Sequence, residues 1–335
     1  MPSKAADPSK PTFYLDHSTF CDALKAHIPE YAGADTASFI ALMPWIERVA
    51  REANLCLSFF HLTELASWED RASADAMVAW LEGLPIVWLR TVTAVEPDEN
   101  RNWAKMAAGI TPKSPVVPFA PSLLTAFQNL PIGAVSHALS TRTPVAELLK
   151  FARSRTAAGP SMTKLAELIR TQDRAAQAQG KSRDDVAKII AYERRVELRT
   201  RAQTADAQLK AARDEEYASK ACSGGELQDL FESRYWNEPL ALPSLKVRWR
   251  FVDGFYANAL EREGPSANER KKLSGSFDDM QHLAIGAAYC DVFTCDGTVS
   301  SWLGDVRTGF GLRPQISRRG LSADGFAKAL MATWP

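Results

Sequence analysis

Short apolar runs alternate with amphipathic stretches through the first 90 residues of the chain. Apolar runs of this length, bounded by turn-forming or polar residues, predict buried strands. The strands are predicted at 12–15, 55–60 and 85–90. Apolar positions at helical spacing predict helices at 36–53, 61–68 and 74–81. This β-α-β-α-β order is typical of an α/β fold built on a parallel sheet.

The same alternation returns near the C-terminus. Ser276 is a good helix cap, and the small apolar residues after Leu283 predict a helix face that packs closely on a sheet and ends near Cys290. Val292–Cys295 then predicts a short buried strand, closed by the turn Asp296–Gly297. Helices at 298–306 and 322–333 and a weak strand-like segment at 315–317 are predicted to complete this layer.

The middle of the chain has a different pattern. Between 97 and 270, strand signals are absent and helical patterns are broken by stretches rich in Pro, Gly and Ser, with one long polar helix predicted at 181–220. The predicted organisation is a flexible start, an α/β domain in two parts and a helical insertion between those parts. The flexible start is 1–11, the α/β domain comprises 12–96 and 271–335, and the helical insertion is 97–270.

Composition narrows the classes of protein only modestly. The chain has 335 residues, and its 40 basic and 40 acidic residues cancel, so overall charge does not indicate a polyanionic partner. No run approaches the roughly 18 apolar residues of a membrane span, and residues 1–11 lack the apolar core of a secretory signal, so no membrane association is expected. Five cysteines without a CxxC pair predict reduced thiols in a cytoplasmic protein.

Two local stretches are candidate nucleic-acid-binding regions. The segment Arg142–Arg183 contains nine basic and three acidic residues, a net charge of +6. We expect its candidate phosphate contacts, Arg153, Arg155 and Lys164, to position a nucleic-acid backbone without reading bases; a solvated helix face is the ordinary alternative. The mixed aromatic and basic stretch 236–255 is consistent either with a core or with a base-stacking surface.

Four acidic residues follow predicted strands or open the next helix. They are Asp16, Glu64, Asp279 and Asp296. Each alone has an ordinary explanation as a helix cap or first-turn residue. Together they are predicted to converge, because the carboxyl ends of parallel strands meet at one edge of a sheet. Clustered carboxylates repel one another unless their pKa values rise or a divalent cation binds, and oxygen ligands suit Mg²⁺ or Mn²⁺.

Several neighbours bear on this acidic cluster. Only one of Asp278 and Asp279 can face it, because adjacent helical residues diverge by about 100 degrees, and the spacing to His282 favours Asp279. His282 itself is expected to pack or to form a hydrogen bond. Thr294 lies two positions before Asp296, so its side chain is predicted to point to the same face and to contact a carboxylate, a metal-bound water or substrate.

These residues resemble the motifs of PIN-domain nucleases. The matching segments are Leu15–Ser18, Leu62–Leu65, Asp279–Ala284 and Asp291–Asp296, within residues 12–95 and 275–334. The resemblance implies a Rossmann-like three-layer α/β/α sandwich with a central parallel sheet. It also implies metal-dependent hydrolysis of phosphodiester bonds, usually in RNA. Asp16, Glu64, Asp279 and Asp296 would be the catalytic metal ligands, and Ser18 matches the polar position after the first motif.

The chain departs from that family pattern at three positions and in the insertion. His17 replaces a small polar residue, Cys295 stands where Asn, Asp or Arg is frequent, and Gly297 stands where Arg is frequent. None of these removes a carboxylate, but they change the rim where substrate would bind. The helical insertion has no counterpart in minimal members of the family.

The sequence hypothesis is therefore a PIN-like endonuclease that uses Mg²⁺ or Mn²⁺ and cuts RNA in preference to DNA. Ser18 and Thr294 are expected to bind substrate together with the basic residues of the insertion. One alternative is a catalytically inactive PIN-like scaffold that binds RNA or a protein partner through the insertion. Another is a helical interaction module that binds a partner or a second copy of the chain, with the sheet domain as its platform.

Overall fold

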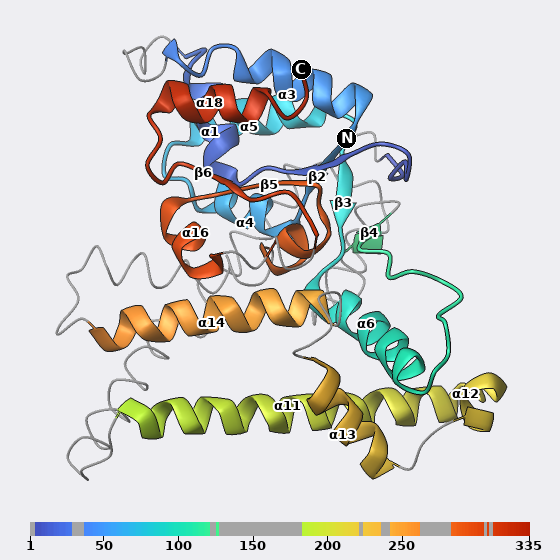
Figure 1. Ribbon diagram of the computed structural model, residues 1–335. Coiled ribbons are helices and arrows are strands. Elements are labelled where there is room, and N and C mark those ends of the chain that lie inside the picture. Colours follow the sequence, from blue (N-terminus) through green and yellow to red (C-terminus); the bar gives the residue numbers. More distant parts are fainter. Residues whose placement is uncertain are drawn as a thin grey trace. The chain divides into compact units, whose positions relative to one another are not determined.

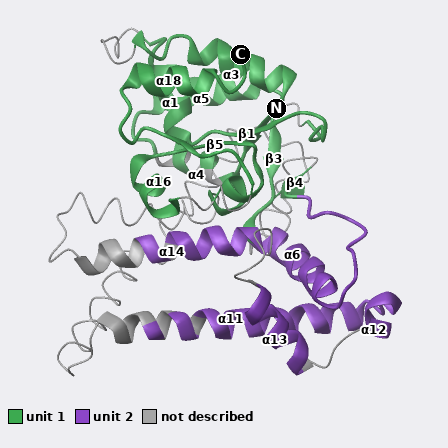
Figure 2. Ribbon diagram, in the orientation of Figure 1, with its two compact units in different colours: residues 1–92, 118–160, 278–335 green, residues 93–117, 161–277 purple. Residues whose placement is uncertain are grey.

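The computed structural model describes residues 4–28, 37–120, 125–126, 183–220, 224–235, 242–261, 283–304, 307 and 311–335. These residues fall into two compact units (Figure 2). Unit 1 draws its described residues from 1–92, 118–160 and 278–335. Unit 2 draws its described residues from 93–117 and 161–277.

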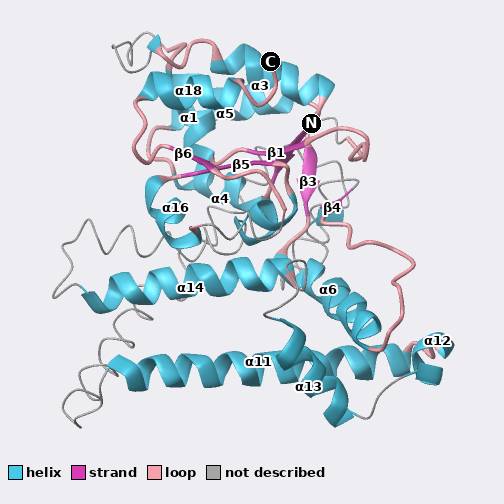
Figure 3. Cartoon of the chain, in the orientation of Figure 1, coloured by secondary structure: helices cyan, strands magenta, loops and turns pink. Residues whose placement is uncertain are grey.

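Unit 1 is an α/β unit whose described residues form one six-stranded sheet, drawn in magenta in Figure 3. The strands are β1 (Thr12–Tyr14), β2 (Asn54–Leu57), β3 (Val87–Leu89), β4 (Phe119–Ala120), β5 (Val292–Cys295) and β6 (Ile316–Ser317). Their order is β4-β3-β2-β1-β5-β6, and all neighbours are parallel except β3 and β4. The predicted α/β class is confirmed, with a mostly parallel sheet that is compatible with three layers.

The antiparallel edge strand β4 was not predicted. It lies within 97–270, so the expectation that this range lacks strands is wrong at this point. Ala120 pairs with Trp88 and Phe119 with Leu89, and the amide of Arg90 donates to the carbonyl of Pro118 at 2.8 Å. Two residues are too few for any period to show in a sequence, so only the pairing with β3 defines this strand.

Helices cover the sheet of unit 1 on both faces, as Figure 1 shows. They are α1 (His17–Lys25), α3 (Leu42–Glu52), α4 (Phe59–Ser67), α5 (Arg71–Glu82), α16 (Gly297–Leu303) and α18 (Ala323–Met331), with a further helical segment at 283–289. The side chains of alternate residues of β1 point to opposite faces of the sheet. Phe13 packs against Trp45 of α3, whereas the ring of Tyr14 contacts Gly286.

Three helices of unit 1 begin at positions that the apolar pattern missed, among them α5, which begins at Arg71 rather than at 74. Helix α3 begins at Leu42 rather than at 36, which places Pro44 in its first turn, where the missing N–H costs no hydrogen bond. Helix α4 begins at Phe59, so Phe59 and Phe60 are helical rather than part of a strand. The cause is Ser58, whose amide donates to Nδ1 of His61 at 3.2 Å in a capping box.

Residues 4–11 are tied to the sheet, although the sequence predicted a flexible start. The side-chain amide of buried Asn54 donates to the carbonyls of Asp7 at 2.7 Å and Lys10 at 3.0 Å, and its oxygen accepts from the amide of Asp7. The Lys4 ammonium donates to the carbonyl of Ala53 at 2.8 Å. One buried polar side chain at the start of β2 therefore orders this segment.

Unit 2 is helical in its described part. Its helices are α6 (Val92–Ala107), α11 (Arg183–Ala211), α12 (Glu215–Lys220), α13 (Gly224–Tyr235) and α14 (Pro243–Glu261). The long helix predicted at 181–220 is broken near Arg213, whose φ of 51° cannot continue a right-handed helix. The core contains Trp103, Leu198 and Phe231, and the first and last of these pack edge to face at 5.6 Å.

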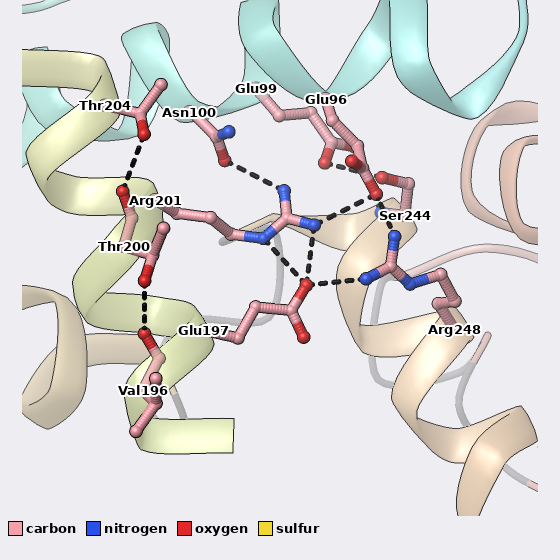
Figure 4. A network of polar contacts seen from close by, with 10 residues as sticks. All are labelled: Glu96, Glu99, Asn100, Val196, Glu197, Thr200, Arg201, Thr204, Ser244 and Arg248. Atoms are coloured by element: carbon pink, nitrogen blue, oxygen red, sulfur yellow. Dashed lines mark hydrogen bonds and ion pairs between the residues drawn. The ribbon is translucent and has the colours of Figure 1, made fainter. Parts of the chain in front are cut away.

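A polar network links α6, α11 and α14 inside unit 2 (Figure 4). The guanidinium of Arg201 contacts Glu197 at 2.8 Å and Glu96 at 3.0 Å, and Arg248 pairs with the same two carboxylates. The two arginines and two glutamates balance in charge. Because Arg248 pairs with both carboxylates, its guanidinium is engaged inside the unit. Phe251 is also buried. At these two residues of 236–255 the structure favours the core alternative over a base-stacking surface.

Candidate functional site

The sheet of unit 1 has a topological switch point between β1 and β5. From β1 the chain continues to β2 and β3 on one side, whereas β5 and β6 lie on the other side. In parallel sheets, ligands bind outside the carboxyl ends of the strands at such a point. Asp16 comes two residues after the end of β1, and Asp296 comes directly after β5. The two residues therefore flank the switch point.

A cavity of about 390 Å³ is found at this edge of the sheet. Asp16, Glu64 and Asp296 all line it, although 280 positions separate the first from the last. Asp22 adds a fourth carboxylate that the sequence analysis did not select. The expected convergence is thus present for three of the four predicted acids. Asp279 and its neighbours Asp278 and His282 lie outside the described residues.

Two of these acids are also helix caps, as their ordinary explanation requires. Asp16 caps α1: one carboxylate oxygen accepts from the amide of Ser18 at 2.7 Å, and the other accepts from its hydroxyl at 2.8 Å. Asp296 caps α16 by accepting from the amide of Val299 at 2.7 Å. Capping fixes the direction of both carboxylates.

Glu64 is carried to the cavity by α4, and a histidine outside the cavity lining fixes that helix. His61 is buried; its Nε2 lies 2.7 Å from the carbonyl oxygen of Leu15, and its Nδ1 accepts from the amide of Ser58. This imidazole connects the end of β1 to the start of α4. Beside Glu64, Nδ1 of His17 lies 3.7 Å from a carboxylate oxygen, and the His17 ring packs edge to face on Trp68 at 5.3 Å.

Thr294 has a different role from the predicted one. It is fully buried, and its hydroxyl accepts from the amide of Asp16 at 2.7 Å and lies 3.3 Å from the hydroxyl of Thr19. The expected direct contact with substrate is therefore wrong. Thr294 instead connects β5 to the residue that caps α1. Its side chain is occupied by the amide of Asp16, just after β1, and by the hydroxyl of Thr19 in α1.

One face of α1 supplies most of the remaining polar lining. Ser18, Cys21, Asp22 and Lys25 follow one another at helical spacing, and all four line the cavity. Of these, the sequence analysis selected only Ser18. Cys21, Asp22 and Lys25 could have been found from their i+3, i+4 and i+7 spacing to Ser18, which places them on the same helix face. That spacing is informative only once Ser18 is known to face a site.

Arg318, just after β6, brings a positive charge close to this acidic edge. Its guanidinium forms an ion pair with Asp22 and donates to the carbonyl of Ser18 at 3.4 Å. It also lies over the rings of Phe326 at 5.0 Å and Phe39 at 5.5 Å. Burial lowers the pKa of Arg318, and the nearby charge of Asp16 opposes that shift. Arg318 therefore offsets part of the repulsion among the carboxylates.

We expect the thiol of Cys21 to be alkylated slowly in the folded protein. Burial, with Glu64 and Asp16 adding to it, raises the pKa of Cys21 from 9.0 to about 12, although Lys25 opposes the shift. The reactive thiolate is therefore scarce at pH 8. The stability contributed by this shift is present below pH 9 and is lost as the pH rises toward 12.

The measurement is the rate of iodoacetamide labelling at Cys21, followed by mass spectrometry at pH 8. Labelling of the native chain should be at least about tenfold slower than labelling of the urea-unfolded chain. Equal rates in the two states would show that the cavity does not suppress the thiolate.

The described donors do not form a preassembled metal centre. Within the described part of the chain, no three His, Cys, Asp or Glu side chains are grouped closely enough to hold a metal ion. The donor chemistry is nevertheless appropriate, because carboxylate oxygens suit Mg²⁺ and Mn²⁺. The three expected phosphate contacts of the insertion, Arg153, Arg155 and Lys164, lie outside the described residues, so the structure does not place them.

Comparison with known proteins found no relative of this chain. No protein-family model matches the chain, and no curated protein or solved structure matches it. Among the described helices, none combines the length and the apolar character needed to cross a membrane.

Proposed function

We propose that this chain is a metal-dependent endonuclease that hydrolyses phosphodiester bonds in RNA. The observation that carries the proposal is the convergence of Asp16, Glu64 and Asp296 on one cavity at the switch point of the sheet. The motifs that resemble those of PIN-domain nucleases supply three of their four expected carboxylates there. A PIN-like three-layer fold with unit 2 as a helical insertion is part of the same proposal.

In this proposal Asp16, Glu64, Asp279 and Asp296 hold one or two Mg²⁺ or Mn²⁺ ions. The bound cation would lower the pKa of a water and neutralise charge that develops on the scissile phosphate. Ser18 orients the carboxylate of Asp16 through two hydrogen bonds and contacts substrate from the same cavity wall. Thr294 and His61 hold the backbone that carries Asp16 and Glu64, as outer partners of ligands commonly do.

The proposal also places the protein in a reducing compartment, the cytoplasm. The four cysteines among the described residues, Cys21, Cys56, Cys290 and Cys295, are all free. Free thiols persist where glutathione and thioredoxin keep them reduced.

The test is cleavage of labelled RNA and DNA, with and without Mn²⁺, by the full chain and by the Asp16→Asn and Asp296→Asn variants. Asparagine caps helices as well as aspartate does, so both variants should keep their helix starts while they lose a charged ligand. We expect RNA cleavage that requires Mn²⁺ and falls by about 100-fold or more in each variant, as expected when several kcal/mol of charge stabilisation are lost.

Asp70→Asn is the matched control. Asp70 caps α5 by accepting from the amides of Ala72 and Ser73 and from the Ser73 hydroxyl, which is the arrangement that Asp16 has with Ser18, but it does not line the cavity. Its cleavage rate should equal that of the parent. If Asp16→Asn also cleaves at the parental rate, the cavity is not the catalytic site.

Metal binding is measured separately through thermal stability. A ligand that binds only the folded state raises the melting temperature, so Mn²⁺ should stabilise the parent more than Asp296→Asn. Without Mn²⁺ the variant should be the more stable protein, because one of the mutually repelling charges is gone. An equal gain from Mn²⁺ in both proteins would remove Asp296 from the ligand set.

A second function is favoured by one observation, the absence of a preassembled group of three ligands among the described residues. It is an inactive scaffold of the same fold that binds RNA or a protein partner. In that case Mn²⁺ leaves the melting temperature of the parent unchanged, no substrate is cut, and RNA affinity is the same in the parent and in Asp16→Asn.

A further inference from the structure

One lysine faces the cavity that the carboxylates share. Lys25 lies in the last turn of α1, seven residues after Ser18, and both side chains line the cavity. Seven residues of helix span about 10 Å. Among the described residues that line the cavity, Lys25 is the only Lys or Arg. The cavity therefore has a basic group about two helical turns from Ser18, with the carboxylate of Asp22 one turn before it on the same helix face.

We propose that Lys25 binds a phosphate of the substrate that lies beyond the one held at the carboxylates. This inference rests on the proposed nuclease function and assigns a substrate-positioning residue within it. Charges along one strand of a nucleic-acid duplex repeat at about 3.4 Å of axis, so a span of about 10 Å reaches beyond a single phosphate. A lysine ammonium is a flexible point charge that suits a phosphate oxygen.

The arrangement of charges explains why such a residue is needed. Asp16, Asp22, Glu64 and Asp296 present four carboxylates to a polyanionic substrate. Arg318 does not line the cavity, and its guanidinium is engaged by Asp22. A cation that faces the cavity offsets the repulsion felt by the approaching strand and aligns the strand along α1. Lys25 meets that requirement.

The ordinary role of a lysine in the last turn of a helix is to complement the helix dipole. Helix α18 provides the comparison, because Lys328 occupies its last turn, pairs with Asp324 and does not line the cavity. The variants are therefore Lys25→Gln, which keeps most of the side-chain length without its charge, and Lys328→Gln as the matched control. Lys25→Arg keeps the positive charge and should retain parental behaviour.

Binding of a labelled single-stranded RNA is measured with Mn²⁺ across a salt series, in the full chain carrying Asp16→Asn to limit cleavage. Loss of one phosphate contact should weaken binding about fivefold at low salt and reduce the slope of log K against log[salt] by about 0.7. In the parent background, Lys25→Gln should raise KM by a similar factor and leave kcat within about twofold. Lys328→Gln should change none of these values.

If the slope of log K against log[salt] is the same in Lys25→Gln as in Lys328→Gln, the phosphate contact of Lys25 is overturned and the nuclease proposal stays intact. Loss of the Mn²⁺-induced rise in melting temperature in Lys25→Gln would also overturn it, because the lysine would then act on the carboxylates rather than on substrate. If the parent cuts no substrate but Lys25→Gln still lowers the slope, the nuclease proposal fails and the phosphate contact stands.

Discussion

Replacing Gly286 by alanine is expected to lower the free energy of unfolding of unit 1 by about 2 kcal/mol, the cost typical of an overpacked core. An added Cβ would lie 2.8 Å from Cγ and Cδ1 of Tyr14. That ring has little room to move: it is buried, stacks on Phe293 at 5.9 Å, and its hydroxyl lies 3.1 Å from Oγ of Ser58. The clash should exceed the roughly 1 kcal/mol that alanine normally gains over glycine in a helix.

The matched control is Gly225→Ala in α13, where an added Cβ meets nothing within 4 Å. This variant should gain up to about 1 kcal/mol from helix propensity, so the same substitution has opposite signs at the two sites. Native-state hydrogen exchange reports each unit separately and is the appropriate measurement. A gain at both positions would show that the segment 283–289 does not pack on Tyr14 as described.

Replacing Arg307 by methionine is expected to cost about 3 kcal/mol, because several buried carbonyl groups lose their donors at once. Arg307 is fully buried, and its guanidinium donates to the carbonyls of Ala287 at 3.1 Å, Cys290, and Asp291 at 3.3 Å. These carbonyls lie at and just beyond the end of the helical segment 283–289, where a cation is also favoured by the helix dipole.

Burial of the charged guanidinium offsets part of the stability that these hydrogen bonds contribute. It lowers the pKa of Arg307 from its ordinary value to about 10, so the cation is present at pH 7 but its desolvation is unfavourable. Raising the pH above 10 should relieve that penalty, because the folded state then loses the proton before the unfolded state does. Urea denaturation at pH 7 measures the net effect, with Arg51→Met as control because that side chain is 60% exposed. Equal stabilities of the two variants would show that the carbonyls do not depend on Arg307.

Local sequence signals located most strands and caps of unit 1. Val292–Cys295 was predicted with the bounds that the structure gives to β5, because a short apolar run bounded by Asp residues has few alternatives. Asp16 caps α1, as its ordinary explanation as a helix cap anticipated. The positions of Asp16, Glu64 and Asp296 followed from these local features and from the rule that the carboxyl ends of parallel strands share an edge.

Other features depend on partners distant in the sequence. Helix α3 is a local exception: it was predicted six residues too early because the apolar spacing was followed past Pro44, which is tolerated only in the first turn of a helix. Strand β4 is defined only by its pairing with β3. Thr294 is engaged by Asp16, 278 positions away, so its role could not be read from the alternation of its own strand.

The sequence by itself determined the α/β class, the places of the strands other than β4 along the chain and the three carboxylates that follow strands, because short-range hydrophobic period and capping chemistry encode them. Tertiary structure alone decided which further side chains share the cavity with these carboxylates. Cys21, Asp22 and Lys25 join it because α1 turns that face toward the switch point. Arg307 and Arg318 have functions set by carbonyls, rings and carboxylates that only folding brings within reach.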